Sequence, residues 1–114
     1  MSIEVKSGEY VDVNDALKRV GGNMGLYKKL LGRFVEGNHM AALVDALKSD
    51  DKEEPIRMAH TIKGVSANLS LIKIRDITTE LEQVLKDGAD HSAHLAELQQ
   101  AYDVTVAQIA EITG

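Results

Sequence analysis

The chain contains a single proline, Pro55, in 114 residues, and almost none of its apolar residues alternate with polar ones. Proline interrupts helices and alternation marks half-buried strands, so a chain with little of either is expected to be all-α. Its length is that of one domain. Hydrophobic residues make up 44% of the chain and charged residues 27%, which provides enough apolar surface for a core and argues against disorder.

Apolar residues that recur every three or four positions predict one short and four long amphipathic helices with short connections. The short helix is expected to run from Asp12 to Val20, where Gly21-Gly22 ends it. Residues 1–11 before it are expected to form a mobile or extended lead-in. The chain is therefore predicted to fold as an antiparallel four-helix bundle with a short extra N-terminal helix, and residues 12–114 form its single domain.

The first long helical segment changes the phase of its apolar stripe at Gly37-Asn38. This change predicts either a bend at that point or a helix that is buried on two sides. The next helix is expected to run to about Leu69. Ser70 is expected to cap the helix that follows, and Asp90 is expected to cap the last one.

The helix that ends near Leu69 has two faces of different composition. An α-helical step of about 100° per residue gathers the core stripe on one face, from Met58, Ile62, Val65 and Leu69. His60, Gly64 and Ala67 fall on the opposite face. A glycine in mid-helix costs about 1 kcal/mol relative to alanine, and at this position it supports nothing internal. What Gly64 supplies is room, so that a bulky partner can approach the His60 imidazole.

Lys63 flanks this exposed strip, and Ile56 beside it is an apolar residue without an obvious place in the core. Neutral imidazole is a good nucleophile near pH 7. Phosphoryl transfer through a phosphohistidine needs in-line access to the ring nitrogen and a cation that offsets the phosphoryl charge, which Lys63 could provide. The strip therefore suits a phosphorylated histidine, with Ile56 and Ala67 as candidate docking contacts.

Residues 59–69 read Ala-His-Thr-Ile-Lys-Gly-Val-Ser-Ala-Asn-Leu. This pattern of His-x-hydrophobic-Lys-Gly, small residues, Asn and an aliphatic residue resembles the signature of histidine-containing phosphotransfer (HPt) domains of bacterial phosphorelays. The resemblance covers roughly residues 10–88, and the last helix matches by pattern only. Ser70 and Val65 depart from it, because the family often has glycine at the first position and a small residue at the second. Glu82 stands where many members carry Gln or another polar group near the phosphohistidine.

The resemblance implies that His60 accepts a phosphoryl group from an aspartyl phosphate on a response-regulator receiver domain and passes it to the aspartate of another. Lys63 would lie beside the phosphoryl group, and Gly64 would keep the docking face clear. An acidic Glu82 would repel phosphate unless it turns to solvent or holds His60 by a hydrogen bond. The chain itself would bind no cofactor. Receiver domains, which bring Mg²⁺, and a hybrid sensor histidine kinase are the expected partners.

Composition and motifs exclude several other classes of protein. Cysteine is absent, which excludes disulfides, zinc-thiolate sites and a cysteine nucleophile. The net charge of −5 disfavours nucleic acid as a partner. No apolar run approaches the roughly 20 residues of a membrane helix, and a cytoplasmic monomer is expected. Nucleotide-binding motifs are also lacking, so the chain is expected to be a phosphocarrier and not an enzyme that uses ATP.

Two alternatives stay open. The first is a non-catalytic four-helix adaptor that docks receiver domains without phosphate turnover, although such an adaptor would need neither His60 nor Lys63. The second is a metal-binding bundle, for which His91 and His94 are candidates because residues three apart can share a helix face. Such bundles place Glu and His pairs inside, whereas the core stripes here are Leu, Ile and Val. No metal site is therefore expected.

Overall fold

The structure, a computed structural model, describes residues 10–114, and this part of the chain is all-α. Its helices are α1 (Val13–Arg19), α2 (Met24–Gly37), α3 (His39–Leu47), α4 (Glu53–Asn68), α5 (Ile72–Lys86) and α6 (Ser92–Thr113). Residues 1–9 of the expected lead-in lie outside the described residues. Val11, the last residue of that lead-in, is fully buried in the core and lies before the start of α1.

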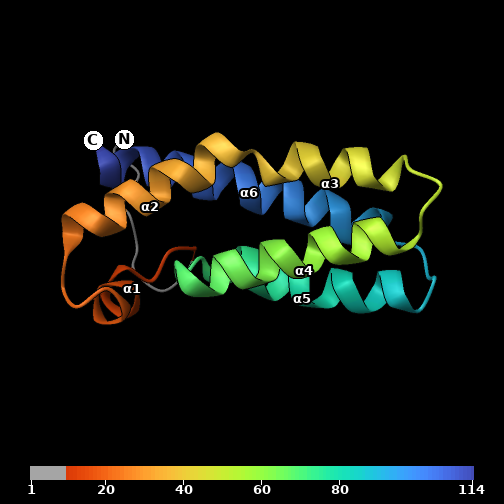
Figure 1. The fold of residues 1–114 in the computed structure, drawn as a ribbon, viewed down its shortest axis with the longest axis horizontal. Coiled ribbons are helices and arrows are strands. Elements are labelled where there is room, and N and C mark those ends of the chain that lie inside the picture. The colour runs from red at the N-terminus through yellow and green to blue at the C-terminus, as the bar shows by residue number, and fades with distance from the viewer. Residues whose placement is uncertain (1–9) are drawn as a thin grey trace.

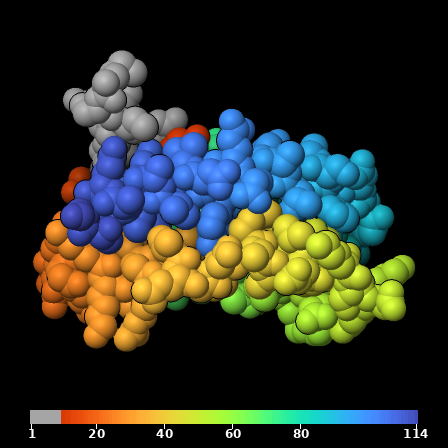
Figure 2. Space-filling view, turned by 90° about the horizontal axis from the view of Figure 1, so that it is seen from above, coloured from red at the N-terminus to blue at the C-terminus, as the bar shows by residue number. Residues whose placement is uncertain are grey.

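α2 and α3 follow one another end to end, and α4, α5 and α6 run alongside them along the length of the molecule (Figure 1). α4 lies against α5, α5 against α6, α3 against α4 and α2 against α6. Figure 2 shows the surface of α6 running along those of α2 and α3. The core consists mainly of large aliphatic and aromatic side chains, among them Tyr27, Leu31, Phe34, Leu43, Ile62, Ile74, Leu81, Leu98 and Ile109. Burying each of these contributes about 1.5–3 kcal/mol to folding.

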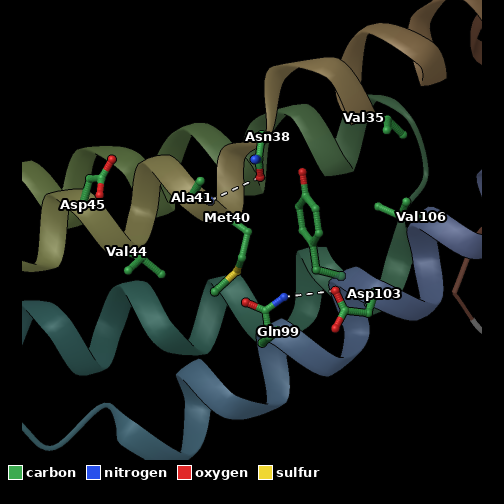
Figure 3. A pocket seen from close by; sticks show the side chains of 10 residues that line it. Val35, Asn38, Met40, Ala41, Val44, Asp45, Gln99, Asp103 and Val106 are labelled. Carbon is green, nitrogen blue, oxygen red and sulfur yellow. Dashed lines mark hydrogen bonds between the residues drawn. The ribbon is translucent and has the colours of Figure 1, made fainter.

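The bend predicted at Gly37-Asn38 is confirmed, because α2 ends at Gly37 and α3 begins one residue after Asn38. Asn38 has a φ of 45°, a left-handed conformation that asparagine adopts more readily than most residues. Its side-chain oxygen accepts a hydrogen bond from the Ala41 amide at 3.4 Å (Figure 3). A single residue therefore terminates α2 and caps α3. The break leaves a hollow of about 510 Å³ beside α6.

Ser70 does not cap α5 with its side chain, contrary to the prediction. Its φ is 56°, and it forms the left-handed turn that ends α4, where the Leu71 amide donates to the Ser66 carbonyl at 2.8 Å. The Ser70 hydroxyl donates instead to Oδ2 of Asp15 at 2.7 Å and so joins α1 to this turn. Close by, the buried Tyr27 hydroxyl donates to the Leu69 carbonyl at 2.8 Å. The carboxyl end of α4 is thus fixed by α1 and α2 together.

Asp12 is the N-cap of α1, whereas the N-cap of α6 is His91, which makes no side-chain cap hydrogen bond, and not Asp90 as predicted. Asp12 accepts a hydrogen bond from the Asp15 amide at 3.0 Å, at the start of α1. Asp90 lies two residues before α6 begins, and its carboxylate accepts hydrogen bonds from both the amide and the hydroxyl of Ser92. Among the described helices, none combines the length and the apolar character that crossing a membrane requires.

Candidate functional site

α4 presents the two faces that the sequence predicts. Ile62 is fully buried, with Met58 and Val65 partly buried at the edge of the core. On the opposite side, the His60 side chain is 70% exposed. A Cβ added to Gly64 would meet no atom within 4 Å, so internal packing does not require a glycine there. The open space beside His60 is therefore a property of the outer surface of α4.

Glu82, on α5, faces His60. The Glu82 side chain is only 8% exposed, and its Oε2 lies 3.6 Å from Nδ1 of His60. The carboxylate does not turn to solvent, which was one of the two arrangements expected for an acid at this position. The separation is slightly longer than a hydrogen bond, and it becomes an ion pair when the imidazole is protonated. Because Nδ1 faces α5, Nε2 on the other side of the ring is directed outward.

Two lysines hold the Glu82 carboxylate. Lys63 places its Nζ 2.9 Å from Oε1, and Lys86 places its Nζ 3.0 Å from Oε2. The ammonium of Lys63, helped by that of Lys86, lowers the pKa of Glu82 from its ordinary value of 4.5 to about 2, although burial acts in the opposite direction. Glu82 is therefore ionised at neutral pH, and these three side chains carry a combined charge of +1.

Lys63 and His60 both lie against Glu82, and the pairing of Lys63 with this carboxylate was not predicted from the sequence. The pairing with Glu82 depends on how α4 packs against α5, which helix periodicity does not specify. Lys86 was missed altogether. Its i, i+4 spacing from Glu82 is the local signal that could have identified it, because residues four apart on a helix are neighbours.

A second hollow, of about 680 Å³, adjoins the carboxyl-terminal half of the exposed strip. Its walls come from the end of α1, from α2, from the first residue of α3 and from α4, where Asn68 follows Gly64 by one turn. Its lining is apolar at Val20, Leu30, Phe34, Val65 and Leu69 and polar at Arg19, Arg33, His39 and Asn68. Ile56 and Ala67, the candidate docking contacts, are both half-buried on α4. On α4 the hollow is lined by residues that directly follow Gly64 and Ala67 in the sequence, namely Val65, Asn68 and Leu69.

The other histidines lie elsewhere. His94 places Nε2 3.5 Å from a carboxylate oxygen of Glu80, and His91 immediately precedes α6. Within residues 10–114, no three potential metal ligands come together. The His39 ring stacks on Phe34 with the ring centroids 5.4 Å apart. His60 is thus the histidine that combines exposure with a paired carboxylate and lysine.

Comparison with known proteins agrees with this geometry. A family model described as the Hpt domain matches residues 31–111, a range that contains His60, Lys63, Gly64 and Glu82. No match was found among curated proteins or among solved structures. Hpt domains are phosphocarriers of two-component phosphorelays, in which they interact with receiver domains and kinases. The chain belongs to the Hpt domain family.

Proposed function

We propose that this chain is a phosphohistidine carrier in which Nε2 of His60 accepts a phosphoryl group from a receiver-domain aspartate and passes it to the aspartate of another receiver domain. One observation carries the proposal. The His60 imidazole is 70% exposed, and its Nδ1 faces a buried, ionised carboxylate. This arrangement leaves the other ring nitrogen open to a partner and favours the tautomer in which that nitrogen is the nucleophile.

In the accepting step, the Nε2 lone pair attacks phosphorus. The N–P bond forms as the P–O bond to the receiver's aspartate breaks, and the electron pair leaves on the aspartate oxygen. The ring keeps its Nδ1 proton and gains positive charge. Glu82, whose Oε2 is 3.6 Å from Nδ1, stabilises that charge. The return step to a second aspartate is the same exchange in reverse, and the receiver domain brings the divalent cation.

Lys63 offsets the charge of the phosphoryl group in this proposal. It lies one turn from His60 on α4, and its side chain is one-third exposed, so the ammonium can leave Glu82 and turn outward. A phosphoryl group carries about −1.5 to −2 charges at pH 7. A flexible lysine one turn from the nucleophile can follow that charge as it moves from partner to imidazole.

The receiver domain docks over Ile56, Gly64 and Ala67 in this proposal, and its contact extends to the hollow between α2 and α4. Gly64 leaves the approach to His60 open. The phosphorylation site of a receiver is acidic, since it consists of the acceptor aspartate and the carboxylates that hold its Mg²⁺. Arg33, an exposed residue that lines the hollow, complements that charge, whereas Arg19 is already paired with Asp15 at 3.2 Å.

We also infer that the protein is an antiparallel four-helix bundle with α1 as an extra N-terminal helix. In this description α2 and α3 count as one rod that bends at Asn38. Successive rods run in opposite directions in Figure 1. α1 joins the turn that follows α4 through the bond between Ser70 and Asp15. This scaffold packs α4 against α5, which is what the pairing of His60 with Glu82 needs.

The proposal is tested by mixing the chain with a receiver domain that has been phosphorylated on its aspartate. Wild type should acquire acid-labile, base-stable phosphate, and His60→Gln should acquire none while its circular dichroism and melting temperature stay unchanged. ATP alone should label neither protein. Binding to the receiver without any label on wild type would contradict the proposal and favour an adaptor.

A further inference from the structure

Lys86 has no part in the carrier mechanism described so far, yet it contacts the same carboxylate as Lys63. The two lysines use different oxygens of Glu82: Oε1 pairs with Lys63 across the interface between α4 and α5, and Oε2 pairs with Lys86 on the same helix. Oε2 is also the oxygen that lies 3.6 Å from His60. Lys86 therefore binds the side of the carboxylate that faces the imidazole.

This arrangement creates an electrostatic conflict when His60 is phosphorylated. Lys63 has to leave Oε1 of Glu82 to reach the phosphoryl group. The buried Glu82 carboxylate would then lose one of its two lysine partners at the moment when the negatively charged phosphoryl group arrives beside it. An unpaired buried charge is strongly unfavourable. Lys86 can stay in place, because its pairing with Glu82 lies within α5 and does not involve α4.

We propose that Lys86 is a positioning residue that keeps the Glu82 carboxylate neutralised while the Lys63 ammonium moves to the phosphoryl group. The proposal rests on the carrier function of His60 given above. With Lys86 in place, Glu82 retains a lysine partner whether or not His60 is phosphorylated, and Lys63 is free to pair with the phosphoryl group. Without Lys86, each movement of Lys63 leaves Glu82 with the imidazole as its one charged neighbour in the site, and the carboxylate and the phosphoryl group compete for a single lysine.

A direct contact between Lys86 and the phosphoryl group is the competing explanation, and Glu82 distinguishes the two. If Lys86 acts by neutralising Glu82, it becomes unnecessary once residue 82 is uncharged. If Lys86 binds phosphate itself, its removal is equally harmful whether residue 82 is Glu or Gln. The effect of Lys86 must therefore be measured in both backgrounds.

The experiment measures the rate at which a prephosphorylated receiver transfers phosphate to wild type, Lys86→Met, Glu82→Gln and the double variant. Lys86→Met should accept phosphate about tenfold more slowly than wild type, the scale of one lost charge-assisted contact. The double variant should match Glu82→Gln within about twofold on the same scale. Lys86→Arg should restore the wild-type rate.

Lys73→Met is the matched control, because Lys73 is an exposed lysine on the same helix and its removal changes the net charge equally. It should leave the transfer rate unchanged. Lys86 is half-exposed at the last residue of α5, so Lys86→Met should keep its helical content, which circular dichroism checks. Equal losses in the wild-type and Glu82→Gln backgrounds, or a Lys86→Met rate equal to wild type, would overturn the role of Lys86 alone. Absence of phosphate on wild type would instead overturn the carrier function, and this inference with it.

Discussion

The Nζ atom of Lys63 lies 2.9 Å from Oε1 of Glu82, so the lysine one turn from the exposed histidine is paired with a buried acid in the structure. The Lys63 ammonium, which offsets the phosphoryl charge in the proposed mechanism, is therefore already paired before phosphate arrives. Glu82 holds Lys63 close to His60 and, through its other oxygen, faces the imidazole. The positions of both Lys63 and His60 in the proposed site therefore depend on the Glu82 carboxylate.

Replacing Lys63 by alanine should slow phosphoryl transfer without preventing the receiver from binding. The reason is that Lys63 serves the charge that is being transferred, whereas docking uses the wider surface around His60. Transfer kinetics and isothermal titration calorimetry measure the two effects separately. Equal transfer rates in Lys63→Ala and wild type would remove Lys63 from the mechanism.

The contribution of Glu82 to the stability of the fold should disappear at acid pH. Its folded pKa of about 2 lies below the ordinary 4.5, so the ionised carboxylate stabilises the fold above pH 4.5. That contribution is lost as the pH falls from 4.5 toward 2. Wild type should therefore melt at a higher temperature than Glu82→Gln at pH 6, and the difference should narrow steadily by pH 2. A difference in melting temperature that stays constant from pH 6 to pH 2 would show that the charge of Glu82 does not stabilise the fold.

Substitutions at Gly64 should separate helix stability from access to His60. Gly64→Ala should raise the free energy of unfolding by about 1 kcal/mol, because alanine is the better helix former and the added Cβ meets no atom within 4 Å. Gly64→Leu should also fold but should slow transfer at least about tenfold by blocking the partner's approach, since a 1 Å misplacement alone can cost about 100-fold. Ala107→Leu places the same bulk on the exposed side of α6 and serves as the control. Wild-type transfer by Gly64→Leu would refute the steric role.

Ser70 offers a test of the turn that ends α4. Ser70→Ala removes the hydrogen bond to Asp15 and keeps the left-handed backbone, so it should lower the free energy of unfolding by about 1 kcal/mol. Ser70→Gly removes the same bond but relieves a left-handed conformation that costs a side-chain-bearing residue about 1–2 kcal/mol. It should therefore be at least as stable as wild type. Urea denaturation gives both values, and a glycine variant less stable than the alanine variant would contradict this account.

Helix periodicity and capping residues were enough to predict much of the fold. They gave the helical segments, the bend at Asn38 and the outward face of α4, because these depend on residues close together in the chain. The HPt signature around His60 added the family, which the match over residues 31–111 confirms. The prediction for Ser70 was wrong because the serine adopts a left-handed conformation. That conformation also accounts for the glycine usual at this position in the family.

The parts that the sequence did not predict arise from packing between helices. The pairing of Lys63 with Glu82 exists only because α4 and α5 lie side by side at one particular rotation. The hollow of about 680 Å³ needs residues of four helices to form its walls. The burial of Val11 was not predicted, because one buried residue in a short segment makes no periodic pattern.

The central claim is that the phosphoryl group is carried on Nε2 of His60, because Glu82 faces Nδ1. The measurement that tests it most directly is a long-range ¹H–¹⁵N NMR correlation on the ¹⁵N-labelled chain after phosphorylation by a receiver domain, which identifies the phosphorylated ring nitrogen. The account predicts a single phosphohistidine, at His60, with phosphorus on Nε2 and a proton on Nδ1. Phosphorus on Nδ1 of His60, or on His39, His91 or His94, would contradict it.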